Sequence, residues 1–138
     1  MSFADLATGA VIRYPYLWSH QAAQGETEGR KSRPVVVGVR LFRPKGGDVI
    51  VLFPSTSQEP PPSRFAAEIP ATEKRRGGLA ADLRLWLIVD EYNQDVLGQP
   101  FYLEPEPKLG QLSKAFLLPL LKAVVARRDQ ATRVNRQL

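Results

Sequence analysis

The sequence contains no cysteine and only one histidine, His20, among its 138 residues. Without cysteine, the chain can form no disulfide, no thiolate zinc site and no cysteine nucleophile. A single imidazole also excludes a metal site built from several histidines, although a site built from carboxylates alone stays open. The acidic residues are scattered along the chain, with neither the spacing of a calcium loop nor a catalytic cluster. We therefore expect no metal and no cofactor.

Long apolar runs are also missing. No stretch of eighteen or more apolar residues occurs, and the first residues lack the pattern of a secretory signal, so we expect a cytoplasmic protein. The length suits a single domain over residues 1–138 with one continuous core. The formal charge of +5 favours a polyanionic partner, either nucleic acid or an acidic protein segment. Many soluble proteins carry such a charge without either partner.

The pattern of apolar residues predicts a mainly β domain. The surest strand is the β-branched run 35–42, which Pro34 can open because its missing N–H need not join a ladder. A turn at 44–47 leads to 48–53, which we expect to be the hairpin partner. Further strands are expected at 9–16, 65–69 and 84–90. Residues 54–64 contain four prolines and are predicted to leave the sheet as a constrained loop.

The remaining segments are predicted to be a loop, a helix and a tail. Residues 17–32 are polar and show no convincing period, which predicts a long mobile loop. Towards the C-terminus, apolar residues recur at helical spacing and predict an amphipathic helix on the sheet. This helix either starts near Ser113 and is kinked at Pro119, or begins near Leu118. Residues 129–138 are predicted to be a frayed basic tail.

Two short motifs lie one predicted strand apart. Residues 29–37, GRKSRPVVV, form a polar segment that ends in Arg33 and Pro34 just before the apolar strand. Residues 54–58, PSTSQ, follow the next strand and contain Thr56. Each motif alone is common, because a charged residue is usually solvated and a loop threonine usually bonds nearby backbone. Together, at this separation, they resemble the motifs of the MazF/PemK toxin family.

That resemblance implies both a fold and an activity. The fold is an α+β, mainly β domain, a small SH3-like barrel with a C-terminal amphipathic helix. The activity is that of a growth-inhibiting, metal-independent endoribonuclease, which cleaves single-stranded RNA, forms a homodimer and is neutralised by an acidic antitoxin protein. The resemblance assigns the catalytic roles to Arg33 and Thr56. During attack by a 2′-hydroxyl, negative charge grows on the phosphate oxygens, where a guanidinium and a hydroxyl can donate.

Polar and aromatic residues around the two motifs are candidates for substrate binding. They are Trp18, His20, Lys31, Ser55, Ser57 and Gln58. Trp18 can stack an unpaired base, and His20 can shuttle a proton. The ordinary alternatives are a tryptophan that covers the edge of the core and an exposed histidine without a role.

Two other functions stay open at this point. The gyrase-poisoning toxins of the same superfamily use the barrel to bind a protein, although they lack the Arg-Pro and Thr pair. A β-barrel that binds RNA without cleaving it would have the same composition. A fold by itself does not decide between these functions.

Overall fold

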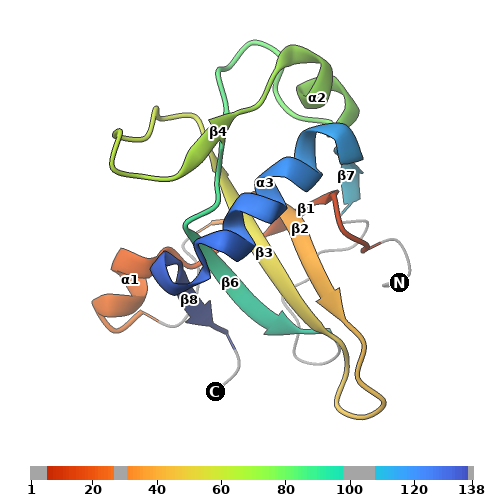
Figure 1. Ribbon diagram of the computed structural model, residues 1–138, viewed down its shortest axis with the longest axis vertical. Coiled ribbons are helices and arrows are strands. Elements are labelled where there is room, and N and C mark those ends of the chain that lie inside the picture. The colour runs from red at the N-terminus through yellow and green to blue at the C-terminus, as the bar shows by residue number, and fades with distance from the viewer. Residues whose placement is uncertain (1–5, 27–30, 98–107, 137–138) are drawn as a thin grey trace.

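The computed structural model describes residues 6–26, 31–97 and 108–136, which form a mainly β fold with three α-helices (Figure 1). Its centre is an antiparallel unit in which β1 (Ala10–Tyr14) pairs with β2 (Arg33–Leu41), and β2 pairs with β3 (Val49–Thr56). The strands predicted from the valine run and its hairpin partner are therefore confirmed. No helix within these ranges is long and apolar enough to span a membrane.

One edge of β3 is shared by two different strands. Residues 49–52 pair with β6 (Glu91–Val96), whereas Ser55 and Thr56 pair with β5 (Trp86–Ile88). The outer strands are β4 (Ala66–Glu68) on β5, β7 (Lys108–Gln111) on β1, and β8 (Thr132–Asn135), which runs parallel to β6. Across the described ranges these eight strands form an open sheet, and their pairings do not close into a barrel.

The core has two buried clusters, one on each face of the central strands. Successive side chains of a strand point to opposite faces, so Val35 and Val37 join one cluster and Val36 joins the other. Helix α3 (Lys114–Ala126) covers the second face and contributes Leu117 to its cluster. Figure 1 shows α3 lying across β2 and β3. The predicted C-terminal helix packed on the sheet is thus confirmed.

The start of α3 is held by a side chain from another helix. Ser113 is its N-cap and accepts from the Phe116 N–H at 3.1 Å, as N-cap serines commonly do. Glu73, buried in α2 (Ala71–Arg76), accepts at 2.8 Å from both the backbone N–H and the hydroxyl of Ser113. The helix therefore begins at the earlier of the two predicted positions and contains Pro119. Pro119 is exposed, so water can reach the carbonyl that lacks its helical donor.

The predicted frayed tail at residues 129–138 is wrong for most of its length. Residues 132–135 form β8, and Val134 and Arg136 are each only 5% exposed. Arg136 donates to the Pro15 carbonyl at 2.7 Å and to Asn93 Oδ1 at 3.1 Å. These long-range bonds and the pairing with β6 order a segment whose local sequence is polar.

The predicted loop at residues 17–32 contains a helix. Helix α1 (Ser19–Ala23) follows Trp18, whose backbone N–H donates to the Gln21 side chain at 3.2 Å. A side chain that caps the first turn in this way lets a short helix form in polar sequence. Residues 27–30 lie outside the described ranges, and the mobility expected for this segment stays a prediction.

Candidate functional site

The β2–β3 hairpin brings the two sequence motifs together. Val35 pairs with Pro54, and continuing this antiparallel register places Arg33 opposite Thr56. Both residues line an open cleft with a volume of about 480 Å³. The cleft is bounded by the start of α1, the start of β2, the end of β3 and the proline-rich segment after β3. Residues separated by a whole hairpin in sequence therefore share one cavity.

With one exception, the predicted site residues line this cleft. Those present are Trp18, His20, Lys31, Arg33, Thr56, Ser57 and Gln58. The exception is Ser55, which is 5% exposed and donates its hydroxyl hydrogen to the Pro34 carbonyl at 2.6 Å. Ser55 alternates with Thr56 along β3, so its side chain points to the other face of the strand. Its hydroxyl joins the start of β2 to the end of β3, and the Ser55 side chain lies outside the cleft that the other predicted residues line.

Arg33 is the most unusual side chain of the cleft. Its guanidinium carbon lies 5.1 Å from the centre of the Trp18 ring. Its Nε is buried and has no hydrogen-bond partner among the described residues. Desolvation by burial lowers the pKa of Arg33, and Tyr16 opposes this shift, although a guanidinium stays protonated near neutrality. A buried donor without a partner costs about 1–3 kcal/mol, and more when it is charged, so an anionic ligand would be strongly favoured here.

Thr56 presents a hydroxyl that is already oriented. Its Oγ1 accepts from the Gln58 backbone N–H at 3.1 Å. A hydroxyl can accept and donate at the same time, so this bond fixes the oxygen and leaves its hydrogen to donate to a ligand. Thr56 is half-buried, whereas the neighbouring Ser57 and Gln58 are exposed.

Trp18 and His20 form the aromatic wall of the cleft, in which Trp18 packs against the core and His20 is exposed. The Trp18 ring meets Tyr16 edge-on, with ring centres 5.1 Å apart, and packs against the first core cluster. On the open side His20 is exposed, with its ring centre 6.5 Å from that of Trp18 and the planes 25° apart. The tryptophan therefore supports the core edge and also borders the cleft.

Arg64 also lines the cleft and was not predicted. Its Nη2 lies 2.6 Å from Asp90 Oδ1 and 3.1 Å from Glu91 Oε1, and its Nε donates to Asp90 Oδ2 at 2.9 Å. These bonds raise the pKa of Arg64, the Asp90 hydrogen bond most strongly. Burial alone would raise the pKa of Asp90, but the hydrogen bonds from Arg64 and the Phe65 N–H outweigh burial and lower it. No local pattern signals this arginine, because its partners lie 26 and 27 positions away.

Because the pKa of Asp90 is lowered, its contribution to the free energy of unfolding should depend on pH. A carboxyl whose folded pKa is depressed stabilises the fold above its unfolded pKa of about 3.9, and this contribution is lost as the pH falls through the folded pKa. We expect Asp90→Asn to lower the free energy of unfolding by roughly 1 kcal/mol at pH 7, after discounting for solvent screening. Urea unfolding at pH 7 and below pH 4 measures this difference, which should shrink in acid. An equal difference at both pH values would contradict the role given to the Arg64 bond.

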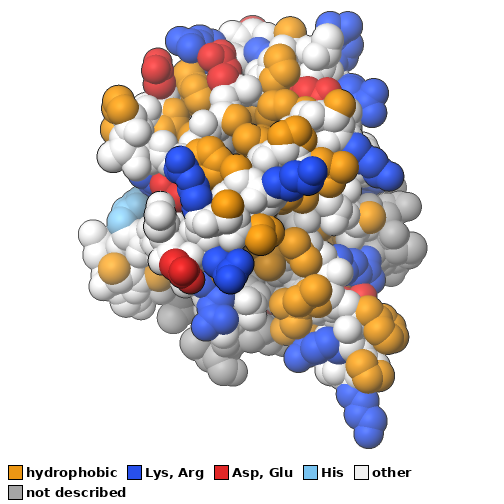
Figure 2. Space-filling view, in the orientation of Figure 1, with side chains coloured by type: hydrophobic (Ala, Val, Ile, Leu, Met, Phe, Trp, Pro, Cys, Tyr) orange, Lys and Arg blue, Asp and Glu red, His pale blue; other side chains and the backbone are white. Residues whose placement is uncertain are grey.

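Three cations line the cleft, Lys31, Arg33 and Arg64, together with one acidic side chain, Glu59. Glu59 is exposed and lies 3.7 Å from Arg84. Over the face that α3 covers, lysines and arginines are spread among apolar, acidic and uncharged side chains (Figure 2). They do not form one continuous stripe on that face. The case for an anionic ligand therefore depends on the cleft. Within the described ranges, no group of three or more histidine or acidic side chains is placed to hold a metal ion.

No family model, curated protein or solved structure matches this chain. The likeness of the two motifs to the MazF/PemK family therefore stays a hypothesis. The geometry of the cleft is the observation from which a function can be proposed.

Proposed function

We propose that the cleft binds single-stranded RNA and cleaves it without a metal, as a toxin-type endoribonuclease. The observation that carries this proposal is the Arg33 guanidinium, desolvated and with an unpartnered Nε among the described residues, in one cleft with the Thr56 hydroxyl. A phosphodiester offers the anionic oxygens that both donors require. The Trp18 ring beside them offers a surface on which an unpaired base can stack.

The proposed reaction takes its nucleophile from the substrate. The ribose 2′-oxygen attacks the adjacent phosphorus, the bond to the 5′-oxygen breaks, and the products are a 2′,3′-cyclic phosphate and a 5′-hydroxyl. Arg33 stabilises the charge that develops on the non-bridging oxygens, and Thr56 donates to the same phosphate and holds it in line. His20 is the only imidazole and lies on the cleft wall, so we assign it the proton transfer.

The proposal extends to the fold and to the acidic partner. We assign the sheet to the SH3-like barrel class. Two features support this assignment: one edge of β3 pairs first with β6 and then with β5, and the sheet has a core cluster on each face. An acidic antitoxin segment would complement Lys31 and Arg33 and cover the cleft.

Incubation of the purified protein with a long single-stranded RNA in the presence of EDTA tests the activity. Discrete fragments are expected. RNA that is retarded on a gel but stays intact would instead indicate a binding protein without catalysis. RNA that is neither cut nor retarded would contradict any RNA function and favour the protein-binding alternative.

We expect Thr56→Val to reduce cleavage only moderately. The substitution keeps the shape of the side chain but removes the hydroxyl, and with it the proposed bond to the phosphate and the bond from the Gln58 N–H. Loss of a hydroxyl hydrogen bond typically costs about 0.5–1.5 kcal/mol, or roughly a two- to tenfold change in rate. Single-turnover kinetics measure the effect. A loss as large as that for Arg33→Ala would show that the roles of the two residues are misassigned.

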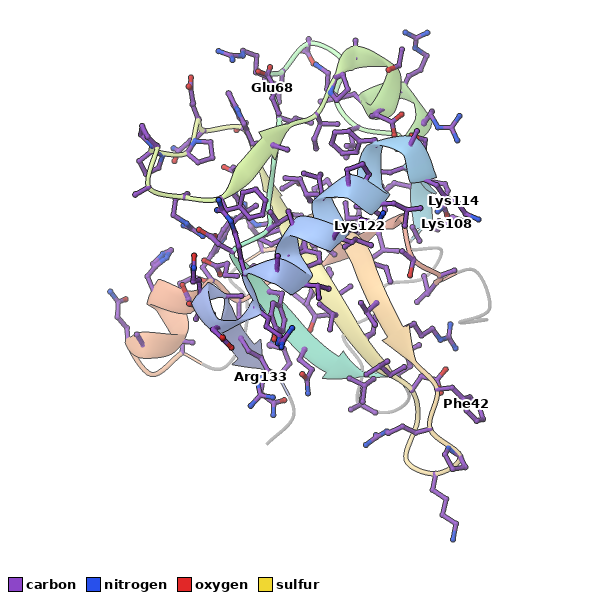
Figure 3. The ribbon with its side chains drawn as sticks, viewed as in Figure 1. Phe42, Glu68, Lys108, Lys114, Lys122 and Arg133 are labelled. Atoms are coloured by element: carbon purple, nitrogen blue, oxygen red, sulfur yellow. The ribbon has the colours of Figure 1, made fainter. Side chains whose placement is uncertain are left out.

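We also expect a homodimer. Several large apolar side chains are left exposed, among them Leu41, Phe42 and Val125, and Figure 3 shows Phe42 projecting outward from the end of the β2–β3 hairpin. Pairing of two chains would bury surface of this kind. Light scattering at micromolar concentration measures the mass in solution. The mass of a single chain would contradict the dimer and leave the cleft proposal untouched.

A further inference from the structure

Behind the cleft lies a buried carboxylate with an unusually complete set of hydrogen bonds. Glu91 in β6 is 2% exposed and does not line the cleft. Its Oε2 accepts from the Ser19 backbone N–H and from the Tyr16 hydroxyl, each at 3.0 Å. Its Oε1 accepts from the Ser19 hydroxyl at 3.0 Å and from Arg64 Nη2 at 3.1 Å. Four donors around one carboxylate offset much of the cost of burying its charge.

These donors come from the segments that build the walls of the cleft. Ser19 is the first residue of α1, and it stands between the cleft residues Trp18 and His20. Tyr16 holds the edge of the Trp18 ring. Arg64 forms part of the cleft lining itself. A single side chain on β6 therefore joins the aromatic segment to the segment that follows the proline-rich loop.

We infer that Glu91 is a positioning residue, which holds the Trp18 and His20 wall at a set distance from Arg33 and Thr56. The expected consequence for RNA cleavage rests on the proposed function. The placement of Trp18 does not, and it can be measured directly on the free protein.

The role requires a carboxylate and not merely a side chain of this size. Glutamate presents two acceptor oxygens, whereas glutamine replaces one of them by an NH₂ group that only donates. If that group takes the place of Oε2 it faces the Ser19 backbone N–H, and in the place of Oε1 it faces the Arg64 guanidinium. In either orientation of Glu91→Gln, two donors oppose each other and the first turn of α1 loses an anchor.

Asp95→Asn is the matched control. Asp95 lies on the same strand, is 0% exposed, and accepts from the Tyr14 hydroxyl at 2.5 Å and from the Val96 N–H at 2.8 Å. Neither Tyr14 nor Val96 lines the cleft. This variant therefore measures the general effect of neutralising a buried carboxylate on β6.

The experiment follows Trp18 by fluorescence in a Trp86→Phe background, in which Trp18 is the one remaining tryptophan. Emission maxima and acrylamide quenching are compared for Glu91→Gln and Asp95→Asn at a temperature where melting curves show both to be folded. We expect Glu91→Gln to shift the emission of Trp18 to the red and to increase its quenching, and Asp95→Asn to leave both unchanged. Cleavage by Glu91→Gln should fall by up to about 100-fold, the loss expected when a wall of a site is displaced by about 1 Å.

Two less disruptive variants, each of which removes one donor to Glu91, keep the test decisive if Glu91→Gln does not fold. Ser19→Ala and Tyr16→Phe each remove one hydroxyl donor to Glu91, and each should move the Trp18 signal in the same direction by less. Trp18 emission and quenching that match those of Asp95→Asn in all three variants would overturn the inference. If the unmodified protein does not cleave RNA, the proposed function fails, but the fluorescence result still decides whether Glu91 positions the wall.

Discussion

Arg33→Ala is expected to abolish RNA cleavage and to leave the fold intact. The side chain stands at the first position of β2 and reaches into the cleft, so its loss removes charge stabilisation and little packing. Loss of one preorganised donor to a developing oxyanion typically lowers the rate by about 100- to 1000-fold. Removing a guanidinium with an unpartnered buried Nε also relieves a desolvation cost, so the melting temperature should not fall sharply.

Two further substitutions at arginines make this result specific. Arg33→Lys keeps a positive charge but loses the planar fork of donors, so it should recover only part of the activity. Arg13→Ala removes one charge from an exposed position of β1 and should cleave RNA as the unmodified protein does. If Arg33→Ala cleaves RNA at an undiminished rate with a normal melting profile, the catalytic assignment is wrong.

Replacing the one ribose on the 5′ side of the scissile bond with deoxyribose should abolish cutting at that bond. The 2′-hydroxyl is the proposed nucleophile, and the mechanism assigns no side chain of the described residues to take its place. Binding should survive, because the other phosphates still contact the positively charged cleft. Gel shift and cleavage of matched oligonucleotides that differ by this single oxygen separate the two effects.

The products of the unmodified RNA give an independent check on the same mechanism. Cleavage in EDTA should leave a 2′,3′-cyclic phosphate and a 5′-hydroxyl, which phosphatase and kinase treatment followed by mass spectrometry can identify. A 5′-phosphate, or undiminished cutting of the deoxy-substituted RNA, would rule out attack by the 2′-oxygen.

Part of the site follows from the hairpin alone. The run of valines at 35–37 and the glycine-containing turn at 44–47 predict two adjacent antiparallel strands, and such strands bring the start of one beside the end of the other. This is why Arg33 and Thr56, named from motifs, lie in one cleft. The face of the strand to which each side chain points is harder to predict from the sequence, as Ser55 shows. Its hydroxyl turns to the Pro34 carbonyl, away from the cleft that Thr56 lines.

Strand β6 was not predicted, because its sequence lacks the apolar pattern of a strand. Its buried positions are occupied by Glu91, Asn93 and Asp95, so the usual alternation of apolar inside and polar outside is absent. These groups are tolerated inside because donors from distant segments satisfy them. Tyr16 lies 75 positions from Glu91 in sequence, and no local window contains both partners.

The sequence by itself determined the mainly β character, the central hairpin, the covering C-terminal helix and the pairing of Arg33 with Thr56. Each of these follows from a period of two or of 3.6 residues, or from a turn, and such patterns are complete within a short stretch of chain. Only the tertiary structure decided that residues 132–135 form strand β8, that Arg136 is buried, and where Arg64 and Glu91 lie. Those features depend on hydrogen bonds whose two ends lie far apart in sequence, up to 122 positions for Arg136 and Tyr14, and a polar group can be buried only once its partner has been brought to it.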